Sequence, residues 1–337
     1  MELRTSFAAG DLDYLANLCH GCGACYWDCQ FAPPHEFAVN VPRALAQLRG
    51  ESYARYAWPG AFAALFARNG VAVVLIAAAS VALFIGGFMA ANDPAVMFGI
   101  RRGAGSFYEL MPHSAMATLF GAAMLYALLA IAMGLRAFWR ATDAPSAGAG
   151  ALWQAVKDTA GLRYLDGADC ATGEERSDRR RLYHHLTFYG FLLCFAATCV
   201  ATVYHYVLGR AAPYAWYEPP VLLGISGGLG LIVGPVGLLF ARTAQDAALA
   251  DPADRGMGTA FILMLLLTSI TGMALLVLRA TPAMGSLLAL HLGVVFALFV
   301  TLPYGKFVHG LYRFAALVRY AVERRAMAAA PAGEHGA

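Results

Sequence analysis

The sequence predicts an all-α membrane protein: a bundle of six transmembrane helices, preceded by a short segment outside the membrane. Hydrophobic residues make up 60% of the chain and charged residues only 13%, a balance too apolar for an ordinary soluble domain. The apolar residues also run unbroken in six stretches, each long enough for the roughly 20 residues of helix that cross a hydrocarbon core. These stretches are 70–91, 114–139, 182–208, 221–241, 257–278 and 285–308.

The distribution of basic residues predicts the orientation, because Lys and Arg in short loops stay on the cytoplasmic side. With the N-terminus inside, the outer face receives only four of the 24 basic residues, Arg101, Arg102, Arg210 and Arg279. Both termini are then cytoplasmic, and a bacterial inner membrane is the expected location. The net charge of +3 is a topology signal, since the basic residues lie beside the spans. No nucleic-acid partner is expected.

The predicted parts of the chain follow from these spans. Residues 1–64 form an extramembrane segment, with an interfacial helix after Asn40 that has Pro42 in its first turn. Residues 65–313 form the membrane domain, which includes a cytoplasmic loop at 140–181. Residues 314–337 form a cytoplasmic tail.

Four cysteines in the first segment follow the pattern CxxCxxCxxxC: Cys19, Cys22, Cys25 and Cys29. Bacterial ferredoxins use this spacing to bind a [4Fe–4S] cluster. Structural zinc sites usually divide four ligands into two separated pairs, and disulfides are rare in a cytoplasmic segment. The fourth cysteine of a two-cluster ferredoxin ligates the other cluster, so either Cys29 or Cys170 of the long loop is the expected fourth ligand.

Histidines at the ends of two spans suggest b-type haem, because ionisable residues in a membrane tend to mark function. His184 and His205 lie 21 residues apart in the third span, about 60° from eclipsed and roughly 32 Å along the axis. His291 and His309, 18 residues apart in the sixth span, fall on one face. Two bis-histidine haems are therefore possible: His184 with His309 near the cytoplasm, and His205 with His291 near the outside. Pro303 is able to kink the sixth span and disturb this registration.

Polar side chains near these histidines suggest further contacts. Arg180, Arg181 and Arg313 are placed to bind the propionates of the inner haem. Two sets of residues are candidates for a quinone carbonyl: His113 near Tyr108 and Glu109 on the outer side, and Tyr304 with Lys306 on the inner side.

Residues 11–25 (DLDYLANLCHGCGAC) and 30–42 (QFAPPHEFAVNVP) resemble the tricarballylate and citrate utilization protein B family. Residues 181–191 (RLYHHLTFYGF) and 302–309 (LPYGKFVH) look like the haem-bearing helices of nitrate reductase gamma subunits. In that wider group the ligand is the histidine five positions before Tyr-Gly-Phe, which is His184 here.

The resemblance implies a six-helix bundle like that of nitrate reductase gamma subunits, with a ferredoxin-like N-terminal segment. Family members are taken to reoxidise an FAD-dependent tricarballylate dehydrogenase and to pass electrons to quinone. They usually carry an earlier cysteine motif and hence two clusters, and this sequence begins just downstream of where that motif would lie.

The leading hypothesis is therefore a quinone-linked electron carrier, in which a flavoprotein reduces the cluster and b-type haem passes electrons to the quinone pool. One alternative is a transporter or redox sensor with a regulatory cluster, which would need broken helices; 226–230 with Pro235 is the candidate break. The other is a passive membrane anchor for a dehydrogenase.

Overall fold

The structure, a computed structural model, describes residues 7–165, 179–243 and 246–329. These residues contain helices and no strand. Six helices among them are long and apolar enough to cross a membrane, which confirms the predicted class. Their elements are α4 (Asn69–Ala91), α6 (His113–Ala141), α8 (Arg179–Tyr206), α9 (Pro219–Thr243), α10 (Pro252–Leu278) and α11 (Met284–Thr301), the last continued by η3 (Leu302–Tyr304) and α12 (Val308–Ala329).

The sixth span departs from the prediction of one helix over 285–308. Its α-helix ends at Thr301, and Pro303 lies in the 3₁₀ turn η3 before α12 begins at Val308. Proline has no N–H to donate to the preceding turn, and its ring clashes with the helix there. His309 therefore belongs to α12, and its angular relation to His291 cannot be computed from one straight helix.

Helix α11 lies in the middle of the bundle, in contact with α4, α10 and α6. Its buried residues include Leu288, Val294 and Ala297. Helices α8 and α9 pack along their lengths through glycines, so closely that a Cβ on Gly227 would lie 2.8 Å from the backbone oxygen of Gly190. Helix α9 runs without interruption through 226–230, the break that a transporter would require, and contains Pro235.

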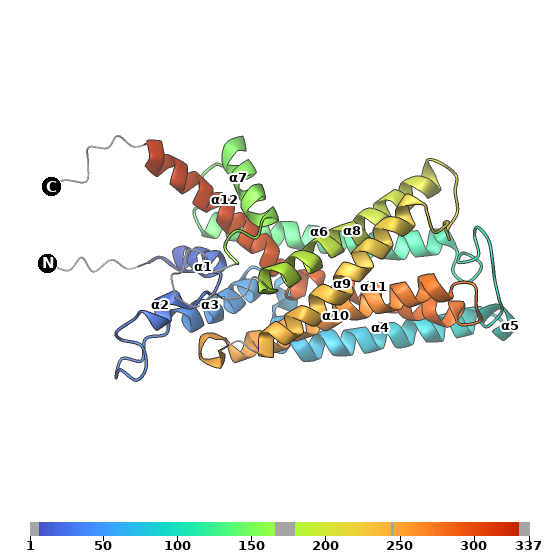
Figure 1. Ribbon diagram of the computed structural model, residues 1–337, viewed down its shortest axis with the longest axis horizontal. Helices are drawn as coiled ribbons and strands as arrows, with labels where there is room; N and C mark the ends of the chain where they lie inside the picture. The colour runs from blue at the N-terminus through green and yellow to red at the C-terminus, as the bar shows by residue number, and fades with distance from the viewer. Residues whose placement is uncertain (1–6, 166–178, 244–245, 330–337) are drawn as a thin grey trace.

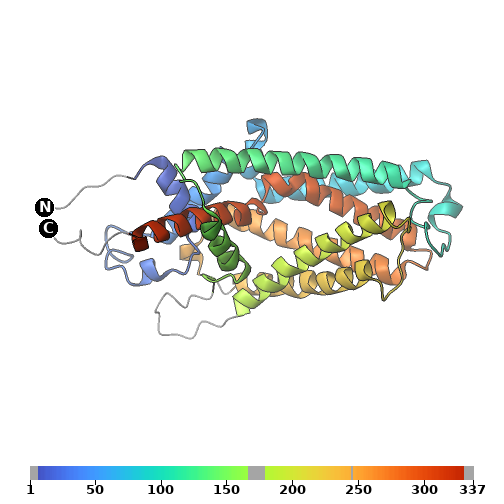
Figure 2. The same cartoon turned by 90° about the horizontal axis from the view of Figure 1, so that it is seen from above.

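The extramembrane helices gather at one end of the bundle (Figure 1). They are α1 (Ala9–Leu18), α2 (Ala24–Trp27), α3 (Val41–Arg55) and α7 (Ala149–Ala160), with η1 (Gly60–Phe66) leading into α4 and η2 (Ala247–Leu249) leading into α10. The short α5 (Pro94–Met97) lies at the opposite end. An even number of spans accounts for α1 and α12 being together, as Figure 2 also shows.

Two segments predicted as a loop and a tail contain packed helix. Helix α7 lies inside the predicted loop 140–181 and packs on α12, which extends to Ala329. Arg319 of α12 binds Asp11 at 3.1 Å and Glu323 at 2.7 Å, and also donates to the carbonyl of Thr142. These contacts hold residues 314–329 against α1 and the end of α6, because long polar side chains of an amphipathic helix can pair across its neighbours.

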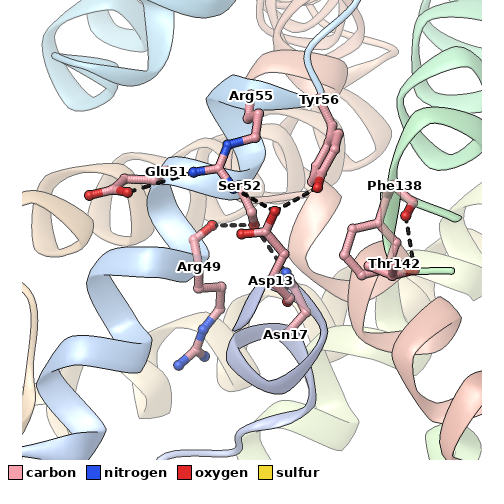
Figure 3. A network of polar contacts seen from close by, with 9 residues as sticks. All are labelled: Asp13, Asn17, Arg49, Glu51, Ser52, Arg55, Tyr56, Phe138 and Thr142. Atoms are coloured by element: carbon pink, nitrogen blue, oxygen red, sulfur yellow. Dashed lines mark hydrogen bonds and ion pairs between the residues drawn. The ribbon is translucent and has the colours of Figure 1, made fainter. Parts of the chain in front are cut away.

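A buried carboxylate joins α1 to α3 (Figure 3). Asp13, which is 1% exposed, accepts hydrogen bonds from Arg55 and from the hydroxyl of Tyr56, each at 2.5 Å. Asn17, one turn further along α1, donates to Ser52 at 3.0 Å. Since a buried charge is tolerated only when it is paired, this network fixes the cysteine-bearing segment on α3.

Candidate functional site: the cysteine loop and the histidine pairs

The cysteine loop begins where α1 ends. Cys19 caps α1, Cys25 lies in α2, and Gly21 (φ +68°) and Gly23 (φ +87°) turn the chain between them. Both glycines adopt the left-handed conformation that other residues rarely take, so the loop can fold tightly enough to direct its cysteines to one region.

The electrostatics of the loop test its fit to a cluster. Burial raises the pKa of the Cys25 thiol, and the other three thiols, those of Cys19, Cys22 and Cys29, raise it further. Four thiols thus share one loop, and thiolate sulfur is the donor that an iron–sulfur centre uses. No three His, Cys, Asp or Glu side chains in the described part of the chain converge on a single metal ion. The residues fit a cluster in donor type and in spacing, because four thiols follow one another within residues 19–29. Cys170 lies outside the described residues.

The inner histidines His184 and His309 face one another across α8 and α12. Their ring centroids are 6.2 Å apart, with the rings inclined at 68°. Two imidazoles that bind one metal ion from opposite sides, through bonds of about 2 Å, have centroids about 6 Å apart. The pair predicted from the sequence is therefore brought together at a separation that fits an iron between the rings.

The protonation of His309 suits an axial ligand. Its Nδ1 lies 2.5 Å from the carbonyl oxygen of Lys306, and because a carbonyl only accepts, Nδ1 must carry the proton. The lone pair is then on Nε2, as in metal-binding histidines whose second nitrogen is held by the backbone. The Nδ1 of His184 is buried with no hydrogen-bond partner.

Two of the three arginines predicted for the propionates are used differently. Arg313, one turn after His309 in α12, donates to the carbonyl of Leu18 at 3.1 Å, immediately before Cys19. Arg181 donates through Nε (3.2 Å) and Nη2 (2.9 Å) to the carbonyl of Gly161, so it holds the start of α8 to the end of α7. Arg313 thus lies between the cysteine loop and the inner histidines, whereas Arg181 is engaged by the backbone.

The outer histidines His205 and His291, which are predicted to pair, each contact a different residue in the described chain. His205 stacks on His113, with ring centroids 3.5 Å apart and planes inclined at 17°, and Tyr108 meets both rings edge-on. His291 instead hydrogen-bonds through Nδ1 to the hydroxyl of Thr271 in α10, at 3.0 Å. Helical phase relates residues of one helix only. Because α8 packs on α9 rather than on α11, the partner of each outer histidine depends on packing between helices.

The inner quinone candidates already have partners within the chain. The hydroxyl of Tyr304 donates to the carbonyl of Trp58 at 3.0 Å and lies 2.7 Å from the hydroxyl of Tyr126. The ammonium of Lys306 lies 5.9 Å from the centre of the Tyr53 ring. On the outer side, the carboxylate of Glu109 is paired with Arg101.

Two family profiles match this chain. The one described as citrate utilization protein B covers residues 65–330. The chain belongs to the citrate utilization protein B family. The profile of that family's Fer4-like domain covers residues 2–55, which contain all four cysteines of the loop.

A curated relative agrees with this assignment. Citrate utilization protein B of Escherichia coli is 46% identical over 329 residues, which are 96% of this chain and 86% of the relative. No solved structure is significantly similar to the chain. The likeness of the membrane part to nitrate reductase gamma subunits therefore stays a prediction.

The structure adds Arg49 and Tyr164 to the residues around the cysteine loop. Arg49 lies in α3, and Tyr164 follows α7 and is in ring contact with His20, the residue after Cys19. In the sequence Arg49 is one of several arginines near the interface and resembles Arg43 and Arg55. Helical spacing within α3 places Arg49 on the face that carries Ser52 and Tyr53. It does not show what that face contacts.

Proposed function

We propose that this protein transfers electrons from a flavoprotein dehydrogenase, through a [4Fe–4S] cluster and b-type haem, to the quinone pool. The partner is an FAD-dependent enzyme like tricarballylate dehydrogenase, which fits the family's role in citrate utilization. The membrane is the bacterial inner membrane, with both termini in the cytoplasm, because the positive-inside rule then leaves four basic residues outside.

One observation carries the proposal: α12 reaches both cofactor sites within a single turn. His309 faces His184, and Arg313 binds the carbonyl next to Cys19. A cluster on the cysteine loop and a haem between the histidines would thus be neighbours held by one helix. That arrangement suits electron transfer and has no purpose in a passive anchor.

Each residue has a defined task in this proposal. The four cysteines bind the cluster as thiolates, and Gly21 and Gly23 let the loop close around it. His184 and His309 would hold the iron of the inner haem through their imidazoles, and the Lys306 carbonyl would fix the tautomer of His309. The cofactors supply the one-electron chemistry, while the protein sets their distance, orientation and potentials.

The outer region supports a less specific proposal. His205 remains a candidate ligand of a second haem, with His291 as predicted from the sequence or with His113, on which it stacks. The quinone candidates His113, Tyr304 and Lys306 are likewise proposals.

The test is to purify the protein in detergent under anaerobic conditions and to measure iron, acid-labile sulfide and haem. We expect the bands of reduced b-type haem and a reduced-cluster electron paramagnetic resonance signal after dithionite, both lost when a soluble quinone analogue is added once the excess dithionite has been removed. Folded protein with a cluster but without haem would overturn the electron-carrier proposal and favour the anchor or sensor. A cluster and haem that quinone cannot oxidise would overturn the quinone step alone.

A further inference from the structure

Two arginines from different helices lie near the end of α1, where the cysteine loop begins. Arg313 of α12 is partly buried and donates to the carbonyl of Leu18 at the end of α1. Its electrostatic neighbours include Arg49 of α3, the thiol of Cys19 and the phenol of Tyr164. Figure 3 shows Arg49 leaving α3 close to the end of α1 that bears Asn17.

These two arginines differ from the others of the described chain that lie near carboxylates. Five ion pairs show the usual arrangement: Arg55 with Asp13, Arg101 with Glu109, Arg163 with Asp158, Arg210 with Glu218, and Arg319 with Asp11. In the described part of the chain, no carboxylate bonds to Arg49 or Arg313, and the Nε of Arg49 is buried without a hydrogen-bond partner. The hydroxyl of Tyr164 is also buried without one.

Two neighbouring guanidinium groups without a counter-ion are costly, because each loses hydration and repels the other. Such a pair is stabilised when an anion lies between or beside them. The carbonyl to which Arg313 donates belongs to the residue before Cys19, and a cluster bound by four thiolates carries net negative charge.

We propose that Arg49 and Arg313 form a cationic site for the negative charge of the iron–sulfur centre on the cysteine loop, and so raise its reduction potential. This inference rests on the proposed function. Reduction adds one electron and one negative charge to the centre and breaks no bond, with the electron coming from a reduced flavin partner, or from dithionite in a test. Two fixed positive charges favour that reduced state over the oxidised one. Both arginines act on the centre through their charge, since neither is a ligand.

The same cations could instead bind a propionate of the inner haem, because Arg313 lies one turn from His309. The observations favour the cluster: the hydrogen bond of Arg313 goes to the residue before Cys19. The two anions are distinguished by which cofactor changes its potential.

The experiment is a redox titration of the full-length protein in detergent, with the cluster followed by electron paramagnetic resonance and the haem by its optical bands. The variants are R313Q, R49Q and R313K. The control is R43Q, which removes an exposed charge from the same helix α3 as Arg49. R49Q keeps the test possible if R313Q does not fold.

We expect R313Q and R49Q each to lower the ratio of reduced to oxidised cluster at a fixed potential about tenfold, a shift of about 59 mV for a one-electron couple. R313K should recover most of this shift because it keeps the charge, and R43Q should show none. A shift of the haem potential alone would assign the cations to a propionate and overturn the proposal, as would unchanged potentials in both glutamine variants. Wild-type protein without a cluster signal would overturn the proposed function itself.

Discussion

Removing one hydroxyl from Tyr56 should loosen the cysteine-bearing segment from the bundle. Tyr56 donates to the carboxylate of Asp13 at 2.5 Å, and Asp13 is 1% exposed. A hydrogen bond to a charged group contributes about 1.5–3 kcal/mol. In Y56F the carboxylate keeps its bond to Arg55, also 2.5 Å long, so it is not left without a partner. We therefore expect a loss of about 2 kcal/mol, an increase of about 30-fold in the population in which α1 has detached from α3.

Hydrogen–deuterium exchange of the protein in lipid nanodiscs measures this opening directly. Peptides from α1 and α3 should exchange about 30-fold faster in Y56F, and faster still in D13A, which leaves Arg55 and the Tyr56 hydroxyl without their acceptor. Y217F is the control, because Tyr217 is 79% exposed and its hydroxyl makes no hydrogen bond within the described residues. Exchange in α1 and α3 that is unchanged in Y56F would refute the reasoning.

Three further predictions concern the helix packing, the Tyr56 hydroxyl and the cysteine loop. G227A should destabilise the bundle by about 1–3 kcal/mol, because its Cβ would lie 2.7 Å from the sulfur of Cys194. In G224A, a change in the same helix, the added Cβ meets no atom within 4 Å, so this variant should unfold like the wild type in a detergent melt. Burial, followed by the hydrogen bond to Asp13, raises the pKa of Tyr56 to about 12. The contribution of the Tyr56 hydroxyl to stability is then complete below about pH 10 and is lost as the pH rises towards 12. Melts of Y56F across that range should not show this loss. C25S should lose the cluster signal while the haem bands persist, which separates the two cofactor sites; loss of both would contradict their independence.

The sequence was sufficient for the spans because their signal is local. Lipid-facing helices need unbroken apolar residues, so the predicted start at residue 70 and end at residue 91 lie within a residue of α4. Pro303 was recognised as a possible kink, but its full effect, the end of α11 at Thr301, depends on how η3 packs against η1 and α6. The amphipathic α7 was missed because the flanking Gly- and charge-rich residues hid a helix of only 12 residues.

The residues of the candidate site could be predicted where they follow a motif in the sequence, and not where they are brought together by packing between helices. The four cysteines lie within one short loop, so their pattern alone located them. His184 and His309 lie face to face, as expected from their position at the same end of their helices, and their binding of a haem stays a prediction. The partner of His205 and the role of Arg49 required contacts between α6 and α8 and between α3 and α12, and residue spacing within one helix carries no information on such contacts.

The central claim is that His184 and His309 hold a haem next to the cysteine loop. The most direct test is the reduced-minus-oxidised optical spectrum of the purified H184A and H309A variants. H185A is the control, because it removes the neighbouring histidine, whose ring lies 5.8 Å from that of Tyr189. H184A and H309A should lose the same b-type haem band while H185A keeps it, with the cluster signal retained in all three. Haem bands that persist unchanged in folded H184A and H309A would contradict it.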